Sequence, residues 1–123
     1  MPDSAETHNF IKSSFRSVWA LELLCVVKSE PGRAFTPPEL VERLRGSDLA
    51  VRQSIANLEA AGLLVSDESG ATQYAPASPE IDRLATSSET LYRRRPNFVR
   101  RLIVMSSSDQ LTAFSDAFRL RKD

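Results

Sequence analysis

The sequence of 123 residues is poor in the side chains from which most catalytic and metal sites are built. It contains one cysteine, Cys25, and one histidine, His8. A single cysteine cannot form a disulfide within the chain, and its place in an apolar run favours a buried, reduced thiol; a redox or ligand-sensing thiol is the alternative. So few thiols and imidazoles leave little from which to assemble a metal cluster or a Cys/His pair. We expect no enzyme activity, no cofactor and no metal.

Long apolar segments are also missing. The most apolar stretches, residues 18–27 and 102–105, are far shorter than the roughly 20 residues that cross a bilayer. The first nine residues are polar and acidic, unlike a secretory signal. A hydrophobic content of 41% is nevertheless enough for a real core. We therefore expect one cytoplasmic domain without a membrane partner, preceded by a flexible N-terminus over residues 1–12.

The chain has no net charge, with 16 basic and 16 acidic residues, but the charge is unevenly distributed. Residues 1–91 carry 8 Lys/Arg against 13 Asp/Glu, and residues 92–123 carry 8 against 3, which gives −5 and +5. Any phosphate-binding surface should draw on this basic C-terminal part. Its first arginines are Arg93, Arg94, Arg95, Arg100 and Arg101.

Apolar periodicity and helix start signals predict a mainly helical fold. Dense apolar residues predict a largely buried first helix from Ser13 or Ser14 to Lys28. The clearest start signal is Thr36-Pro37-Pro38-Glu39, in which the threonine can cap the helix, proline suits the first turn and the glutamate can complete a capping box. This signal predicts a second helix that runs to about Leu44 or Arg45.

A third helix and a small β-hairpin should follow. We expect Gly46 to permit a tight turn, and Ser47 or Asp48 to cap a helix whose apolar positions repeat at helical spacing. Residues 63–75 then alternate as two short strands around a polar turn, and a third short strand at residues 34–36 is compatible with them. The fold class is therefore mainly α with a small β-hairpin.

The C-terminal part should form further helices. Pro76 and Pro79 mark the exit from the hairpin, and Pro96 either breaks the fourth helix or starts a fifth. We divide the chain into a domain at residues 13–76 and a C-terminal helical segment at 77–123. The fourth helix is marked by the stripe Ile81, Leu84, Ser88 and Leu91. Two later stripes provide surplus apolar surface, which indicates dimerisation: Phe98, Val99, Leu102 and Ile103; and Leu111, Phe114 and Phe118.

The stretch from Ser47 to Leu64 contains a sequence motif, SDLAVRQSIANLEAAGLL. It resembles the recognition helix and following strand of bacterial winged helix-turn-helix repressors of the ArsR and MarR types, through Ser, Ala-Val, a spaced Ile and Leu, and Leu-Glu-x-Ala-Gly-Leu. The resemblance covers residues 14–75. It implies a winged helix-turn-helix domain, to which the C-terminal helices are added, and a role in transcription regulation.

The resemblance also implies which residues contact double-stranded DNA. The third helix would lie in the major groove, where Arg52 can pair with guanine and where Gln53 and Asn57 can read adenine. Serine hydroxyls would contact phosphates. The arginine cluster lies outside the resemblance, and we expect it to supply positive charge either beside this helix or from a second protomer. The expected DNA-binding residues are Ser47, Asp48, Arg52, Gln53, Ser54, Asn57, Arg93, Arg94 and Arg95.

Two features keep a second function open. The hairpin, residues 66–75, contains Asp67 and Glu68 but no lysine or arginine, and residues 10–75 carry 7 basic against 8 acidic side chains. The chain is therefore expected to be a homodimeric DNA-binding regulator. The alternative is a winged-helix protein-interaction module that acts on a partner regulator or a component of the transcription machinery. In that case the polar side chains would form a solvated or protein-binding face.

Overall fold

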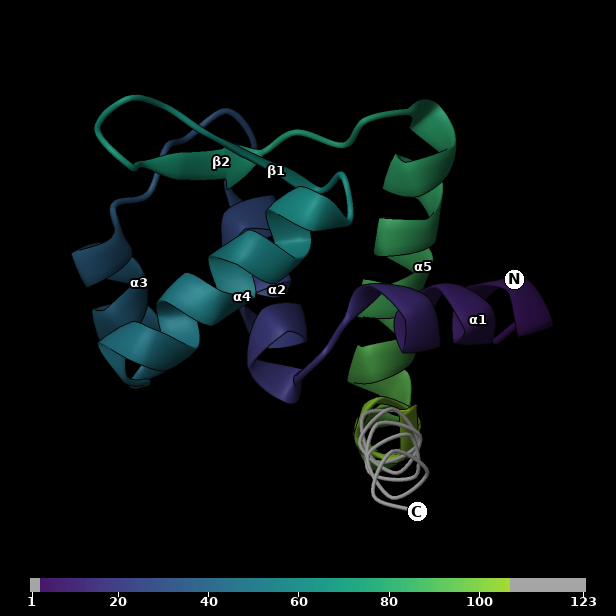
Figure 1. Ribbon diagram of the computed structural model, residues 1–123. Helices are drawn as coiled ribbons and strands as arrows, with labels where there is room; N and C mark the ends of the chain where they lie inside the picture. Colours follow the sequence, from purple (N-terminus) through teal and green to yellow (C-terminus); the bar gives the residue numbers. More distant parts are fainter. Residues whose placement is uncertain (1–2, 107–123) are drawn as a thin grey trace, which may run out of the picture.

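The computed structural model describes residues 3–106 of the chain. As predicted, it is mainly helical and has one small antiparallel hairpin. Residues 96–106, beyond the last labelled helix, are also helical. The labelled elements in chain order are α1 (Ala5–Ser14), α2 (Val18–Ser29), α3 (Pro37–Leu44), α4 (Asp48–Ala60), β1 (Leu64–Ser66), β2 (Thr72–Tyr74) and α5 (Pro79–Arg94) (Figure 1).

The N-terminal segment is a helix, which differs from the flexible lead-in that we expected over residues 1–12. Ser4 caps α1 by accepting a hydrogen bond from the amide of Thr7. The helix packs across α5 (Figure 1), with Ile11 fully buried and an ion pair between Glu6 and Arg83 at 3.1 Å. Because one narrow face is enough to attach α1, its sequence can remain largely polar.

The predicted start of the first long helix at Ser13 or Ser14 is wrong, because this region contains two helices. α1 ends at Ser14, and α2 begins only after Ser17, whose hydroxyl accepts a hydrogen bond from the amide of Ala20. Between the two helices, Phe15 is almost completely buried. Phe15 therefore packs in the core although it lies in the link between two helices.

The start of α3 matches the prediction, whereas the turn after it is built differently. Thr36 and Glu39 form the complete capping box. In the turn, the left-handed residue is Arg45, with φ of 54°, and not Gly46. A Cβ at Gly46 would lie 3.1 Å from the ring of Trp19, so the glycine is needed for close packing against α2.

The hairpin has the predicted position. β1 and β2 are antiparallel, with Val65 opposite Gln73. Phe35 adds an isolated bridge to Thr72, with backbone hydrogen bonds of 2.8 Å in both directions. The third strand considered at residues 34–36 is thus present as a single bridge. It ties the segment before α3 to the hairpin.

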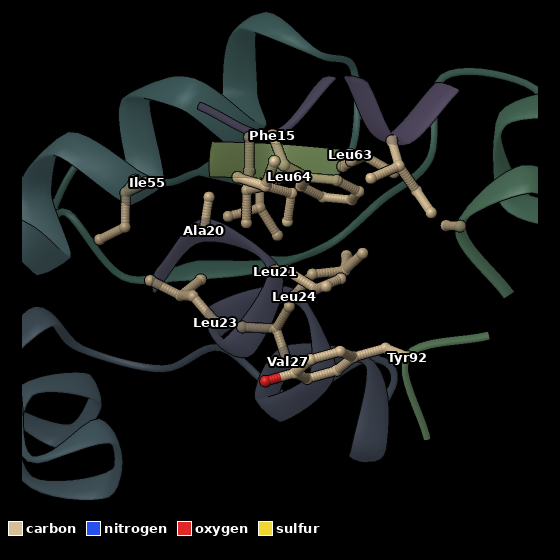
Figure 2. Packing of buried hydrophobic residues seen from close by; sticks show 14 of the residues in the cluster. Phe15, Ala20, Leu21, Leu23, Leu24, Val27, Ile55, Leu63, Leu64 and Tyr92 are labelled. Atoms are coloured by element: carbon tan, nitrogen blue, oxygen red, sulfur yellow. The ribbon is translucent and has the colours of Figure 1, made fainter. Parts of the chain in front are cut away.

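The core is centred on α2, which contacts α3, α4 and β2. Leu21, Leu24 and Val27 of this helix are fully buried, and Figure 2 shows them between the hairpin residue Leu63 and Tyr92 of α5. This arrangement leaves α4 attached along one face. No helix within residues 3–106 is long and apolar enough to cross a bilayer.

The C-terminal helices begin where the prolines predicted. α5 starts at Pro79, and Pro96 starts the helical residues 96–106, in which Val99 and Ile103 are buried. The last predicted helix, with its stripe from Leu111 to Phe118, lies outside the described residues. The described C-terminal part packs on α1 and α2 and so belongs to the same folded unit as the hairpin.

Candidate nucleic-acid interface

The outer face of α4 is the most extended polar surface among the predicted site residues. Val51, Ile55 and Leu58 point into the core, while Arg52 and Gln53 are exposed. Ser47 caps the helix through its hydroxyl, which accepts a 3.0 Å hydrogen bond from the amide of Ala50. The capping serine is itself exposed. The first half of α4 can therefore approach a large partner without rearrangement.

Ser54, predicted to contact phosphate, is buried, so this prediction is wrong. Only 2% of its surface is exposed. Ser54 follows Val51 by three residues and lies next to Ile55, which places it within the stripe that faces the core. The small serine fits there, and it cannot reach a ligand on the outer face.

Asn57 is also wrongly placed by the sequence analysis, because its side-chain amide is occupied within the protein. Its Oδ1 accepts a 2.9 Å hydrogen bond from the backbone amide of Arg16, and its Nδ2 donates a 2.6 Å bond to the carbonyl of Ser14. The amide thus holds the junction between α1 and α2 against α4. Because both the carbonyl oxygen and the amino group of this side chain are bonded within the protein, they are not available for the two hydrogen bonds that recognise adenine.

Arg52 and Asp48 form an ion pair one turn apart on the outer face of α4. The distance from Arg52 Nε to Asp48 Oδ2 is 2.7 Å, and the two side chains are 67% and 64% exposed. Such an exposed pair contributes at most about 1 kcal/mol to stability. In this structure the pair places the guanidinium of Arg52 beside the first turn of α4.

Two arginines that sequence analysis did not select flank this face. Arg16 and Ser17 line a hollow of about 470 Å³ beside Trp19 and Gln53. Arg45, at the turn before α4, is exposed. Two sequence signals lie near these arginines: the serine that caps α2 and the short turn between α3 and α4. Neither signal shows which arginines lie next to α4 in the fold.

The cluster Arg93, Arg94 and Arg95 is exposed at the end of α5. Figure 1 shows this end of α5 and the first turn of α4 on opposite sides of α2, so the cluster does not extend the α4 surface within one chain. Arg95 is also engaged locally, because it bonds to Asp3 at 3.1 Å and its guanidinium lies 4.1 Å from the ring centroid of Phe98.

The hairpin turn keeps its negative charge. Asp67 accepts hydrogen bonds from the hydroxyl and amide of Ser69 and from the amide of Ala71. The hydroxyl of Ser69 is the main cause of a pKa below the usual value for this carboxyl. An ionised Asp67 disfavours close approach of a phosphate, so the hairpin tip is a poor contact for nucleic acid.

Within residues 3–106, the single cysteine and the single histidine are both packed within the fold. Burial raises the pKa of the Cys25 thiol to about 12, which keeps it protonated at neutral pH. His8 is not in a loose tail but in α1, where it bonds to Asp3 and contacts the ring of Phe98. Within residues 3–106, no group of three His, Cys, Asp or Glu side chains could hold a metal ion.

Searches against protein-family models, curated proteins and solved structures found no match.

Proposed function

We propose that the protein is a cytoplasmic winged helix-turn-helix regulator of transcription that binds DNA with α4. The observation that carries the proposal is the uncovered outer face of α4, on which Arg52 and Gln53 are exposed after a turn that joins it to α3. An α-helix fits the major groove, where arginine and glutamine can bond to base edges. The bridge from Phe35 to the hairpin adds support, because winged folds pair a third short strand there.

The surroundings of α4 supply groups for the phosphates on either side of a major groove. Arg16 and Ser17 lie along one edge, and Arg45 precedes the first turn. Phosphate contacts of this kind fix the position of a helix on the duplex and provide most of the salt-dependent affinity. With Ser54 and Asn57 removed from the contact set, Ser47, Asp48, Arg52 and Gln53 remain on α4.

This proposal predicts binding that weakens steeply with salt. Purified protein mixed with pooled genomic DNA fragments should retain a subset of fragments that share a short motif. With about three phosphate contacts per protomer and two protomers, the affinity should fall by roughly a thousandfold between 50 and 200 mM salt. Retention measured over a salt series, followed by sequencing, checks this expectation. The absence of retained fragments even at 50 mM salt would contradict the proposal.

A homodimer would place two copies of α4 about one helical turn of DNA apart, as a palindromic site requires. An exposed apolar surface on the last described helix supports self-association. Val104 and Met105 are 56% and 63% exposed, and Met105 lines a hollow of about 240 Å³ with Phe98 and Leu102. Such a surface is more apolar than a monomer needs.

Light scattering should therefore give a dimeric mass at tens of micromolar, and Val104→Asp combined with Met105→Asp should give a monomer. The two carboxylates would have to lose their hydration in the contact, which is strongly unfavourable. Glu59→Asp and Glu80→Asp together are a matched surface control that should remain dimeric. If the unaltered protein has a monomeric mass, the proposed dimer is wrong.

A second function is favoured by one specific group of observations. Trp19 of α2 is 41% exposed beside α4, Leu49 in the first turn of α4 is 65% exposed, and the hairpin tip is acidic. Aromatic and aliphatic side chains of this kind commonly anchor protein partners. A protein-interaction module would use the same α4 face and would bind a partner with little dependence on DNA, which separates it from the regulator in the fragment experiment.

A further inference from the structure

The Asp48–Arg52 pair places a negative charge on the surface that we propose to meet DNA. A free carboxylate there would repel phosphates, yet this carboxylate is bonded to the arginine that can read guanine. The bond engages Nε, at the side of the guanidinium fork. Among the described residues, no other partner is bonded to Arg52, so the two terminal amino groups remain available for a ligand.

We propose that Asp48 is a specificity-determining residue that positions Arg52 for end-on recognition of guanine and withholds it from the phosphates. The inference rests on the proposed DNA-binding function. Guanine offers O6 and N7 as adjacent acceptors, and the two terminal amino groups of an arginine can bond to both at once. A guanidinium that is bonded through Nε still presents its two terminal amino groups to a base. It is less free to turn toward the phosphates of the DNA backbone.

The pair also lowers affinity for DNA of the wrong sequence. A freely rotating arginine binds any phosphate and releases counterions in doing so. Asp48, one turn earlier on α4, neutralises the charge of Arg52. Arg52 therefore adds to the affinity mainly where a guanine accepts hydrogen bonds from both of its terminal amino groups. Specificity is a difference between two affinities, and weakening the wrong complex increases it as effectively as strengthening the right one.

Asp48 has a structural role too, because it occupies the first turn of α4, where a carboxylate favours the helix dipole. The test must therefore separate positioning from helix stability and from simple charge. Asp48→Asn keeps an acceptor for Arg52 Nε and removes the charge, whereas Asp48→Ala removes both. Glu59→Ala removes one exposed negative charge from the same helix and leaves the pair intact.

The experiment first selects a duplex from a pool of random 20-base-pair DNA with the unaltered protein. Affinities of each variant for this duplex and for unselected pool DNA are then measured in the same salt series. In Asp48→Ala we expect binding to pool DNA to strengthen several-fold and discrimination to fall by up to about fivefold, with a steeper salt dependence. Asp48→Asn should retain more discrimination than Asp48→Ala. Thermal unfolding confirms that each variant is folded at the temperature of the assay.

The decisive comparison uses Arg52→Ala as the background. If Asp48 acts through Arg52, Asp48→Ala should no longer change discrimination once Arg52 is absent. An equal change in both backgrounds, or a Glu59→Ala effect of the same size on discrimination, would overturn the positioning role while leaving DNA binding intact. Failure of the unaltered protein to bind any duplex would instead overturn the proposed function, and this inference with it.

Discussion

Asn57→Ala is expected to lower the free energy of unfolding by about 2 kcal/mol, a large effect for one side chain near the surface. The substitution removes the two hydrogen bonds that join α4 to the α1–α2 junction. It also leaves the carbonyl of the buried Ser14 without this donor. The higher helix propensity of alanine offsets part of the loss. Urea denaturation followed by circular dichroism measures the change.

Gln53→Ala is the matched control, because Gln53 lies one turn earlier on α4 and is exposed. Its stability change should stay within about 0.5 kcal/mol. If Asn57→Ala is as stable as the unaltered protein and loses preference for one base, the side chain reads DNA after all. The hydrogen bonds to the α1–α2 junction would then have no energetic importance.

The regular elements were largely predictable because their signals are local. The threonine that caps α3 and the prolines and glutamate of its first turn act within four residues of one another, and so do Ser47 and the first turn of α4. The hairpin was predictable for the same reason, since a polar turn follows the short apolar segment at residues 63–65 and precedes the returning strand at residues 72–75. The bridge between Phe35 and Thr72 could be anticipated only as compatible with a winged fold.

The errors concern interactions between residues distant in the sequence. From the sequence alone, Asn57 is predicted to be an outward polar residue. In the fold, a segment more than 40 residues earlier lies against α4 and hydrogen-bonds to its side chain. α1 was missed because its attachment to α5 depends on a partner some 75 residues away. Ser54 was assigned to the outer face of α4 because it is polar. The face of α4 that α2 and α3 bury is wider than the stripe of apolar residues on this helix.

Arg52→Ala should weaken binding to a selected duplex by about 1–3 kcal/mol, which corresponds to roughly 5- to 150-fold, and should relax the preference at one or two base positions. Binding to random DNA should change much less, because Asp48 already neutralises this side chain. Stability should stay within about 0.5 kcal/mol, since the pair is exposed. Competition titrations with single-base variants of the duplex measure both effects.

Arg93→Ala with Arg94→Ala provides the contrasting variant, and it leaves Arg95 bonded to Asp3. If a second protomer brings this cluster to the phosphates, the double variant should weaken selected and random duplexes by the same factor and flatten the salt dependence. Arg52 and the cluster then differ in kind, since one changes sequence preference and the other changes only overall affinity. An Arg52→Ala protein with unaltered DNA binding that no longer retains a protein partner would instead favour the interaction module, because the exposed face of α4 would then serve protein recognition.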